Sequence, residues 1–166
     1  MARYINISPQ WRCDLRNTSI KINALSDIIE ASGGGYIYTG YKSIGIGSLW
    51  HGRISAVKID ELGNEIWVSD NLGPQSNGEA CSIEETNVGS FVIAGFIGTP
   101  FNMGGTRTPI IIKTDNNGNQ QWERTFTFPE ASIYSIKETP DGGFITSGIT
   151  NSNSALEFVV FIMKTD

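Results

Sequence analysis

The sequence predicts an all-β fold built from three repeated units, and two observations lead to that prediction. Short segments rich in β-branched and aromatic residues alternate with clusters of Gly, Asn, Asp and Pro, while no segment shows an apolar period of 3.6 residues. In addition, three features recur about every 55 residues, and a constant period of this kind indicates a repeat architecture. The recurring residues are Trp11, Trp67 and Trp122, the glycines Gly40, Gly95 and Gly148, and the lysines Lys58, Lys113 and Lys164.

Each repeated unit is predicted to contain four strands. The first strand is followed by a tight turn, such as Pro140-Asp141-Gly142, where Pro fixes φ and Gly accepts a positive φ. A Gly-rich second strand, a variable loop, a β-branched third strand and a turn with Asp, Gly and Asn follow, and the fourth strand carries the repeated Trp. The predicted first strands are 26–30, 81–85 and 134–138, the second 34–41, 89–96 and 142–149, and the third 53–59, 109–114 and 158–164.

Four-stranded antiparallel units in series are typical of β-propellers, in which each unit forms one blade. The segments KTDNNGNQQW (113–122) and ETPDGGFITSGIT (138–150) resemble the repeats of bacterial β-propeller proteins. They are more distantly similar to the Asp-x-x-x-Gly-x-x-x-Trp repeats of quinoprotein-type (PQQ-like) propellers, although the Asp-to-Gly spacing is one residue shorter here. The resemblance covers essentially the whole chain, and it implies blades between which the repeated Trp docks.

The quinone cofactor of the enzymes in that group is not expected here. The resemblance implies that the quinone enzymes of that group also have a calcium site and a disulfide between adjacent cysteines. The two cysteines here, Cys13 and Cys81, are not adjacent in the sequence. We interpret both as ordinary small apolar residues. His51 is the only histidine, so a zinc site with several His or Cys ligands is not expected either.

The chain, residues 1–166, is predicted to form one domain with repeats at about 11–67, 67–122 and 122–166. The third repeat ends after its third strand, and residues 8–14 carry the pattern of an isolated fourth strand. Three blades are too few for a ring, since propellers typically have four to eight. We therefore expect two chains to form a six-bladed homodimer, in which residues 8–14 of each chain complete the last blade of its partner.

Other assemblies remain open from the sequence. A trimer or another closed ring would also cover the apolar blade faces, which should not stay exposed over a large area. The chain could instead be a fragment of a longer propeller, or a β-fold that is not a propeller.

The loops between the second and third strands belong to the predicted ligand-binding face, because variable loops on a rigid scaffold are common binding sites. The candidate ligand-binding residues are Trp50, His51 and Arg53 in the first loop and Phe101, Asn102 and Arg107 in the second. An aromatic ring beside Asn, His and Arg suits stacking on a sugar or another planar ligand with hydrogen bonds around it. The alternative is that Trp50 and Phe101 cover neighbouring blades or a subunit joint and that His51 lies on the surface.

Glu30, Glu85 and Glu138 occupy one position in the repeat, at the end of the first strand. In a six-bladed ring they would form a circle of carboxylates at the channel mouth, where they could attract a cation. The alternative is that they are solvated strand ends, because closely spaced like charges repel one another. We therefore predict no metal site from these residues.

Composition argues against one class of partner. Only 17% of the residues are charged and the net charge is −5, whereas nucleic-acid binders carry a basic face.

No apolar run reaches the ~18 residues of a membrane helix, and the N-terminal residues lack the pattern of a signal peptide. We expect no membrane partner and a cytoplasmic protein, or a secreted or periplasmic one if a signal peptide has been removed.

The expected function is a non-catalytic binding or interaction module without a cofactor, with carbohydrate or protein as ligand and a second copy as partner. The first alternative is a hydrolase or lyase with carboxylates in the channel, which would need a convergent pair of acids. No catalytic residue is predicted, because no such pair stands out from the turns. The second alternative is a purely structural propeller fragment.

Overall fold

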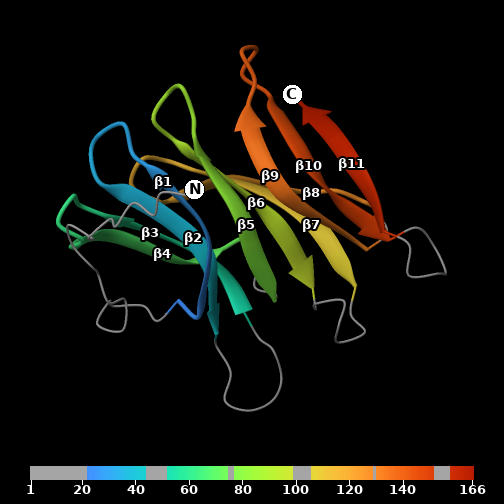
Figure 1. Cartoon of the computed structure of the whole chain (residues 1–166), viewed down its shortest axis with the longest axis horizontal. Helices are drawn as coiled ribbons and strands as arrows, with labels where there is room; N and C mark the ends of the chain where they lie inside the picture. Colours follow the sequence, from blue (N-terminus) through green and yellow to red (C-terminus); the bar gives the residue numbers. More distant parts are fainter. Residues whose placement is uncertain (1–21, 44–51, 75–76, 99–105, 129, 152–157) are drawn as a thin grey trace, which may run out of the picture.

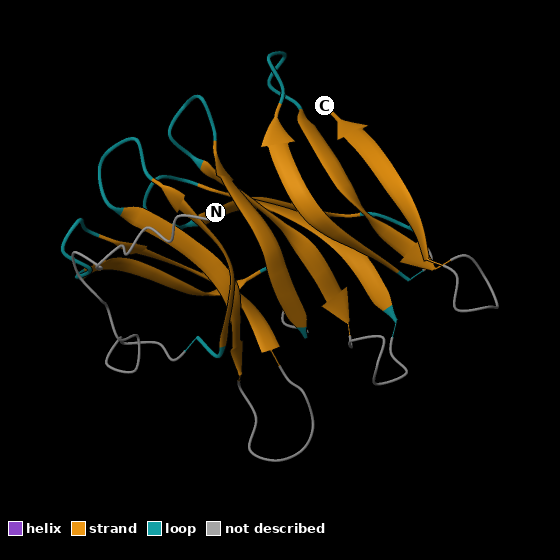
Figure 2. Ribbon diagram, viewed as in Figure 1, coloured by secondary structure: helices purple, strands orange, loops and turns teal. Residues whose placement is uncertain are grey.

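The residues that the computed structural model describes form eleven strands in three antiparallel sheets, which confirms the all-β prediction (Figure 1). It describes residues 22–43, 52–74, 77–98, 106–128, 130–151 and 158–166. Figure 2 shows strands and connecting loops with no helix in the described ranges, so these ranges contain no helix of the length and apolarity that crossing a membrane requires.

The sheets follow one another along the chain, and each has its strands in sequence order. The first sheet contains β1 (Ala24–Glu30), β2 (Tyr36–Ser43), β3 (Gly52–Ile59) and β4 (Glu65–Leu72). The second contains β5 (Gly78–Glu85), β6 (Phe91–Gly98), β7 (Arg107–Thr114) and β8 (Gln120–Thr125). The third contains β9 (Ala131–Glu138), β10 (Phe144–Asn151) and β11 (Phe158–Thr165). The four predicted strands per unit are thus present in the first two sheets, and the predicted strand at 8–14 lies outside the described residues.

The turns between the third and fourth strands explain the repeated pattern of Asp, Gly and Asn. In the turn after β3, Oδ1 of Asp60 accepts the backbone N–H of Leu62 (2.9 Å) and of Asn64 (2.8 Å). The turn after β7 repeats both bonds around Asp115, at 2.9 and 2.8 Å. The glycine of each turn has a positive φ, 86° in the first and 80° in the second, which favours glycine at this position. Both segments are tight turns, as predicted.

The three sheets pack face to face in chain order, with β5 against β1, β2 and β3, and β9 against β5, β6 and β7. The first interface buries Ile54 of β3 against Ile110 and Ile112 of β7. The second interface buries Ile111 of β7 and Ile136 of β9. Successive side chains of a strand point to opposite faces, so β7 contributes to both interfaces. The second sheet is therefore apolar on both faces.

Trp67 and Trp122 lie in the fourth strands and dock against the next sheet. The ring centre of Trp67 lies 6.0 Å from that of Phe91, and the ring centre of Trp122 lies 6.1 Å from that of Phe144. The indole N–H of Trp67 also donates to a backbone carbonyl in the turn after β7, at 3.1 Å. The repeated Trp thus joins consecutive sheets at both positions, whereas Trp11 lies outside the described residues.

A β-bulge interrupts the first strand of each sheet at the same position of the repeat. The extra residues are Ser26, Cys81 and Tyr134. The repeated strand glycine lies opposite each bulge, on the second strand. A Cβ atom on Gly40, Gly95 or Gly148 would overlap the carbonyl oxygen of the residue two positions before the bulge. This close approach of two backbones explains why all three units have glycine here.

The bulges also account for a difference between the predicted and observed first strands. The predicted strands begin at the bulge residues, whereas the observed strands begin earlier, at Ala24, Gly78 and Ala131. A bulge inserts one residue and so shifts the alternation of apolar and polar side chains. The alternating pattern therefore ends at the bulge, although the hydrogen-bonded strand continues past it.

Replacing Gly95 with Ala should lower the free energy of unfolding by about 3 kcal/mol, because the new methyl group would overlap the carbonyl oxygen of Glu79. The matched control is Gly33→Ala, whose Cβ would lie 4.0 Å from the nearest atom, Nζ of Lys58, and which should change stability by less than about 1 kcal/mol. Urea unfolding followed by circular dichroism measures both variants. Equal effects of the two substitutions would contradict the bulge geometry.

Candidate functional site

Arg53 and Arg107 are the two predicted ligand-binding residues that the structure describes, and both lie near the start of a third strand. Arg53 is the second residue of β3, and Arg107 is the first residue of β7. The first strands start at the same end of the sheets, because each second strand is antiparallel to both of its neighbours. The predicted residues Trp50, His51, Phe101 and Asn102 lie outside the described residues.

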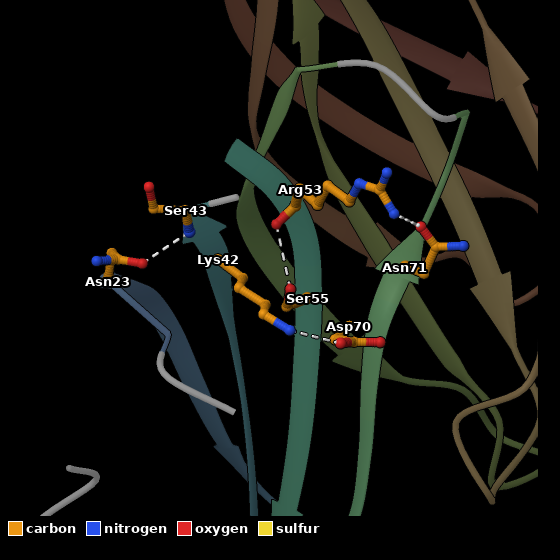
Figure 3. A network of polar contacts seen from close by, with 7 residues as sticks. All are labelled: Asn23, Lys42, Ser43, Arg53, Ser55, Asp70 and Asn71. Atoms are coloured by element: carbon orange, nitrogen blue, oxygen red, sulfur yellow. Dashed lines mark hydrogen bonds and ion pairs between the residues drawn. The ribbon is translucent and has the colours of Figure 1, made fainter. Parts of the chain in front are cut away.

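Arg53 belongs to a polar network within the first sheet. Its guanidinium donates to Oδ1 of Asn71 on β4, and its carbonyl accepts the Ser55 hydroxyl at 3.1 Å (Figure 3). Beside it, Lys42 of β2 and Asp70 of β4 form an ion pair of 2.7 Å. These contacts hold three neighbouring strands together, so packing within its own sheet explains the position of Arg53.

Arg107, in contrast, reaches from the second sheet to the third. Its guanidinium carbon lies 3.8 Å from the centre of the Phe96 ring, a distance at which a cation is attracted to the face of the ring. Its Nη1 donates to Oγ of Ser132 on β9 at 3.2 Å. The same nitrogen lies 3.4 Å from the hydroxyl oxygen of Tyr134, the bulge residue of β9, which is a long and weak hydrogen bond. The side chain is therefore held against one aromatic ring and two hydroxyl groups.

Glu79 places a half-buried carboxyl group near this guanidinium. Burial raises the pKa of the Glu79 carboxyl above its ordinary value. The nearby charge of Arg107 and a hydrogen bond from the hydroxyl of Ser26, the bulge residue of β1, oppose this effect only in part. Glu79 thus connects the first strands of the first two sheets to Arg107.

Cys81, the bulge residue of β5, lies close enough to Glu79 and Arg107 for their charges to shift the pKa of its thiol. Burial raises the pKa of its thiol to about 12, and the negative charge of Glu79 adds to the increase while Arg107 opposes it. A thiol with such a pKa is uncharged near pH 7, and it is the thiolate that acts as nucleophile or metal ligand. Cys81 is therefore unsuited to nucleophilic chemistry.

These side chains form one connected group, which we call the bulge cluster. It consists of Ser26, Glu79, Cys81, Phe96, Arg107, Ser132 and Tyr134. The three bulges bring it together from the first strands of all three sheets. Sequence reasoning found Arg107 alone as a ligand-binding candidate, although glycine inside a strand is a known signal for a bulge nearby.

The chemistry of the bulge cluster favours hydrogen bonding over metal binding. It offers a carboxylate, a guanidinium, hydroxyl groups and the ring of Tyr134, which is 44% exposed. Throughout the described ranges, no group of three or more His, Cys, Asp and Glu side chains could hold a metal ion. The cluster is therefore best suited to a polar ligand held by hydrogen bonds.

Glu85 and Glu138 act as acceptors between neighbouring sheets. Glu85 accepts hydrogen bonds from the backbone N–H (2.7 Å) and the hydroxyl (2.6 Å) of Ser32, in the turn of the preceding sheet. Glu138 accepts the backbone N–H of Asn87 at 2.6 Å, and Asn87 occupies the repeat position of Ser32. Glu30 is exposed. The expectation of solvated strand ends therefore holds for Glu30 but is wrong for Glu85 and Glu138, whose carboxylates bridge neighbouring sheets.

Comparison with known proteins does not assign a family. No protein-family model matches the chain, and no curated protein matches it in sequence. The packing of the sheets and the bulge cluster are therefore the evidence on function.

The pKa shifts of two carboxyl groups predict opposite responses of stability to pH. The pKa of Glu79 is raised, so its ionisation destabilises the fold as the pH rises above about 4.5. The pKa of Asp141 is lowered, chiefly by its hydrogen bond with Lys164, so the stability it adds is present at neutral pH and lost in strong acid. Between pH 4 and pH 7, the stability of Glu79→Gln relative to wild type should increase. Asp141→Asn should be less stable than wild type at neutral pH, and this difference should disappear below about pH 3. Thermal unfolding at several pH values measures both, and a Glu79→Gln difference independent of pH would contradict the assignment.

Proposed function

We propose that this chain is one half of a six-bladed β-propeller, which closes as a homodimer and serves as a non-catalytic carbohydrate-binding module. The observation that supports closure is a contrast in exposure between equivalent residues. On the third sheet and on β1 of the first sheet, several apolar residues are exposed whose equivalents are buried between consecutive sheets. Solvent-exposed apolar patches of this kind are typical of interaction surfaces.

One such surface is the free face of the third sheet. Ile162 of β11 is 74% exposed, whereas Ile111, at the same repeat position of β7, is 1% exposed because the third sheet covers it. Ile145 and Val160 are also exposed, and Val92, the equivalent of Ile145, is buried. The third sheet thus presents the face that the second sheet uses for contact with its successor.

The other surface lies along β1 of the first sheet. Ile28 of β1 is 56% exposed, whereas its equivalent Ile83 on β5 is 1% exposed against the first sheet. Leu25 is likewise exposed, while its equivalent Ala80 is buried. β1 thus exposes apolar residues at positions that β5 uses for contact with the preceding sheet, whereas Tyr38 and Val57, the equivalents of Ile93 and Ile112, are buried in a cluster of the first sheet.

These two faces suit each other, and a second copy supplies both of them. A two-fold axis would place the first sheet of each chain on the third sheet of the other and produce two equivalent joints. Residues 8–14 would then add beside β11 of the partner and give its third sheet a fourth strand. In this arrangement Trp11 would face Tyr36 of its own chain, as Trp67 faces Phe91 and Trp122 faces Phe144.

The binding function rests on the bulge cluster at the loop-bearing end of the sheets. Loops on a rigid scaffold are frequent binding sites, and the cluster offers both donors and acceptors there. Glycoside hydrolysis uses a pair of carboxyl groups. Among the described members of the cluster Glu79 is the only carboxyl group, which favours binding over catalysis.

Ile162→Lys should separate the dimer into single chains, because the new charge would be buried at the joint. Sedimentation equilibrium should then give the 18.1 kDa of one chain for the variant and twice that mass for the wild type. The matched control is Val88→Lys, at an equally exposed site (77%) in a turn between the first two strands of the second sheet. A monomeric wild type, or equal dissociation of both variants, would refute closure.

The proposed joint lacks one hydrogen bond that both internal interfaces have. Glu85 and Glu138 each accept a backbone N–H from the preceding turn, but the equivalent donor position for Glu30 is Pro140, which has no N–H. Pro140→Ser introduces the residue that pairs with Glu85 at the first interface. We expect the dimer to become about tenfold tighter, since hydrogen bonds to charged groups contribute ~1.5–3 kcal/mol.

The control for this prediction is the double variant Pro140→Ser with Glu30→Ala, in which the acceptor is removed. It should bind its partner no more tightly than Glu30→Ala alone. The dissociation constants follow from dilution of fluorescently labelled dimers. An equal gain with and without Glu30 would show that the two positions do not meet across the joint.

A further inference from the structure

We infer that the bulge cluster is a binding site for a neutral sugar ring or a similar polyol, with Tyr134 as its stacking surface and Glu79 and Arg107 as its hydrogen-bond partners. The inference rests on the proposed binding function and assigns it to particular residues.

The three bulges keep a constant backbone and present different side chains. The strand glycine opposite the bulge is the same in all three units, whereas the bulge residue is Ser26, Cys81 or Tyr134. Bulges redirect side chains and are common beside functional sites. A constant scaffold with variable side chains is the arrangement expected at a recognition site, whereas a purely structural position would favour one residue type.

The charges of the cluster point to an uncharged ligand. The carboxylate of Glu79 and the guanidinium of Arg107 are near one another and opposite in sign, so an ionic ligand gains little net attraction. A hydroxyl group, in contrast, can donate to the carboxylate and accept from the guanidinium. A ligand with several neighbouring hydroxyl groups can therefore use both side chains at once.

Arg107 is held in position for this role. Its stacking on Phe96 and its hydrogen bond to Ser132 fix the plane of the guanidinium. The contact to the Tyr134 hydroxyl is long, at 3.4 Å, so a ligand oxygen at a shorter distance would compete well with it. A fixed donor reduces the loss of side-chain freedom when the ligand binds.

Tyr134 supplies the apolar part of the site. Its ring is 44% exposed although Ser132 and Ile133, next to it on β9, are buried. An exposed ring beside fixed polar groups matches the composition of small-molecule sites, in which aromatic surface is combined with a few polar groups. The faces of sugar rings carry C–H groups that pack on such a surface, while the hydroxyl groups at the ring edge reach Glu79 and Arg107.

The inference is tested with the full-length chain on an array of neutral and acidic glycans, followed by titration calorimetry with the best neutral glycan. Glu79→Gln, Arg107→Lys and Tyr134→Ala should each weaken binding about tenfold or more. The control is Ser135→Ala, which changes the exposed neighbour of Tyr134 outside the cluster and should leave affinity unchanged. Circular dichroism establishes that each variant is folded.

The possible outcomes separate the site from the broader function. If the three cluster variants bind neutral glycans as well as the wild type does, the assignment to this site is overturned, while the carbohydrate-binding function stands. Preference for acidic glycans would overturn the neutral class of ligand. Binding of no glycan at all would overturn both this inference and the carbohydrate-binding function. The whole cluster belongs to one chain, so Ile162→Lys should bind as well as the wild type whether or not the ring closes.

Discussion

Burial of both faces of each sheet is the constraint on which the rest of this structure depends. A single small sheet is marginally stable in water, and here the second sheet gains its stability by placing Ile110 and Ile112 on one neighbour and Ile111 on the other. Every interior sheet of such a stack needs a predecessor and a successor. Ile162 on the third sheet and Ile28 on β1 are exposed positions at which the described residues do not meet this requirement. The proposed self-association would use the same kind of packing that holds one chain together.

The same stacking creates the candidate binding site. The first strands lie against one another at the sheet interfaces, so Ser26 contacts Glu79, and Glu79 and Tyr134 both lie near Arg107. Glycine opposite each bulge allows the backbones to approach closely without fixing the residue that the bulge presents. The scaffold and the proposed recognition chemistry are thus separated at the level of single positions, which allows side chains to vary while the packing stays constant.

Much of the fold follows from the sequence, because local periodicity and turn chemistry are encoded residue by residue. The strands and the Asp-centred turns were predictable for that reason, whereas the docking of Trp67 was expected only from the resemblance to propeller repeats. The bulges were not, because an inserted residue breaks the alternation from which strands are predicted. The site was predicted least well: Arg107 was found, but its relation to Glu79 depends on packing between strands and sheets that no local pattern records. The bridges from Glu85 and Glu138 to the preceding turns escaped prediction for the same reason.

The account is tested most directly at the outer edge of β11, where a partner strand is proposed to dock. Hydrogen–deuterium exchange of the wild-type chain, followed by mass spectrometry across Phe158–Thr165, compares this strand with β10, which has neighbours on both sides. The account predicts that β11 is protected as well as β10 at high protein concentration, and that this protection is lost on dilution. Exchange of β11 at the rate of an open strand edge at every concentration would contradict it.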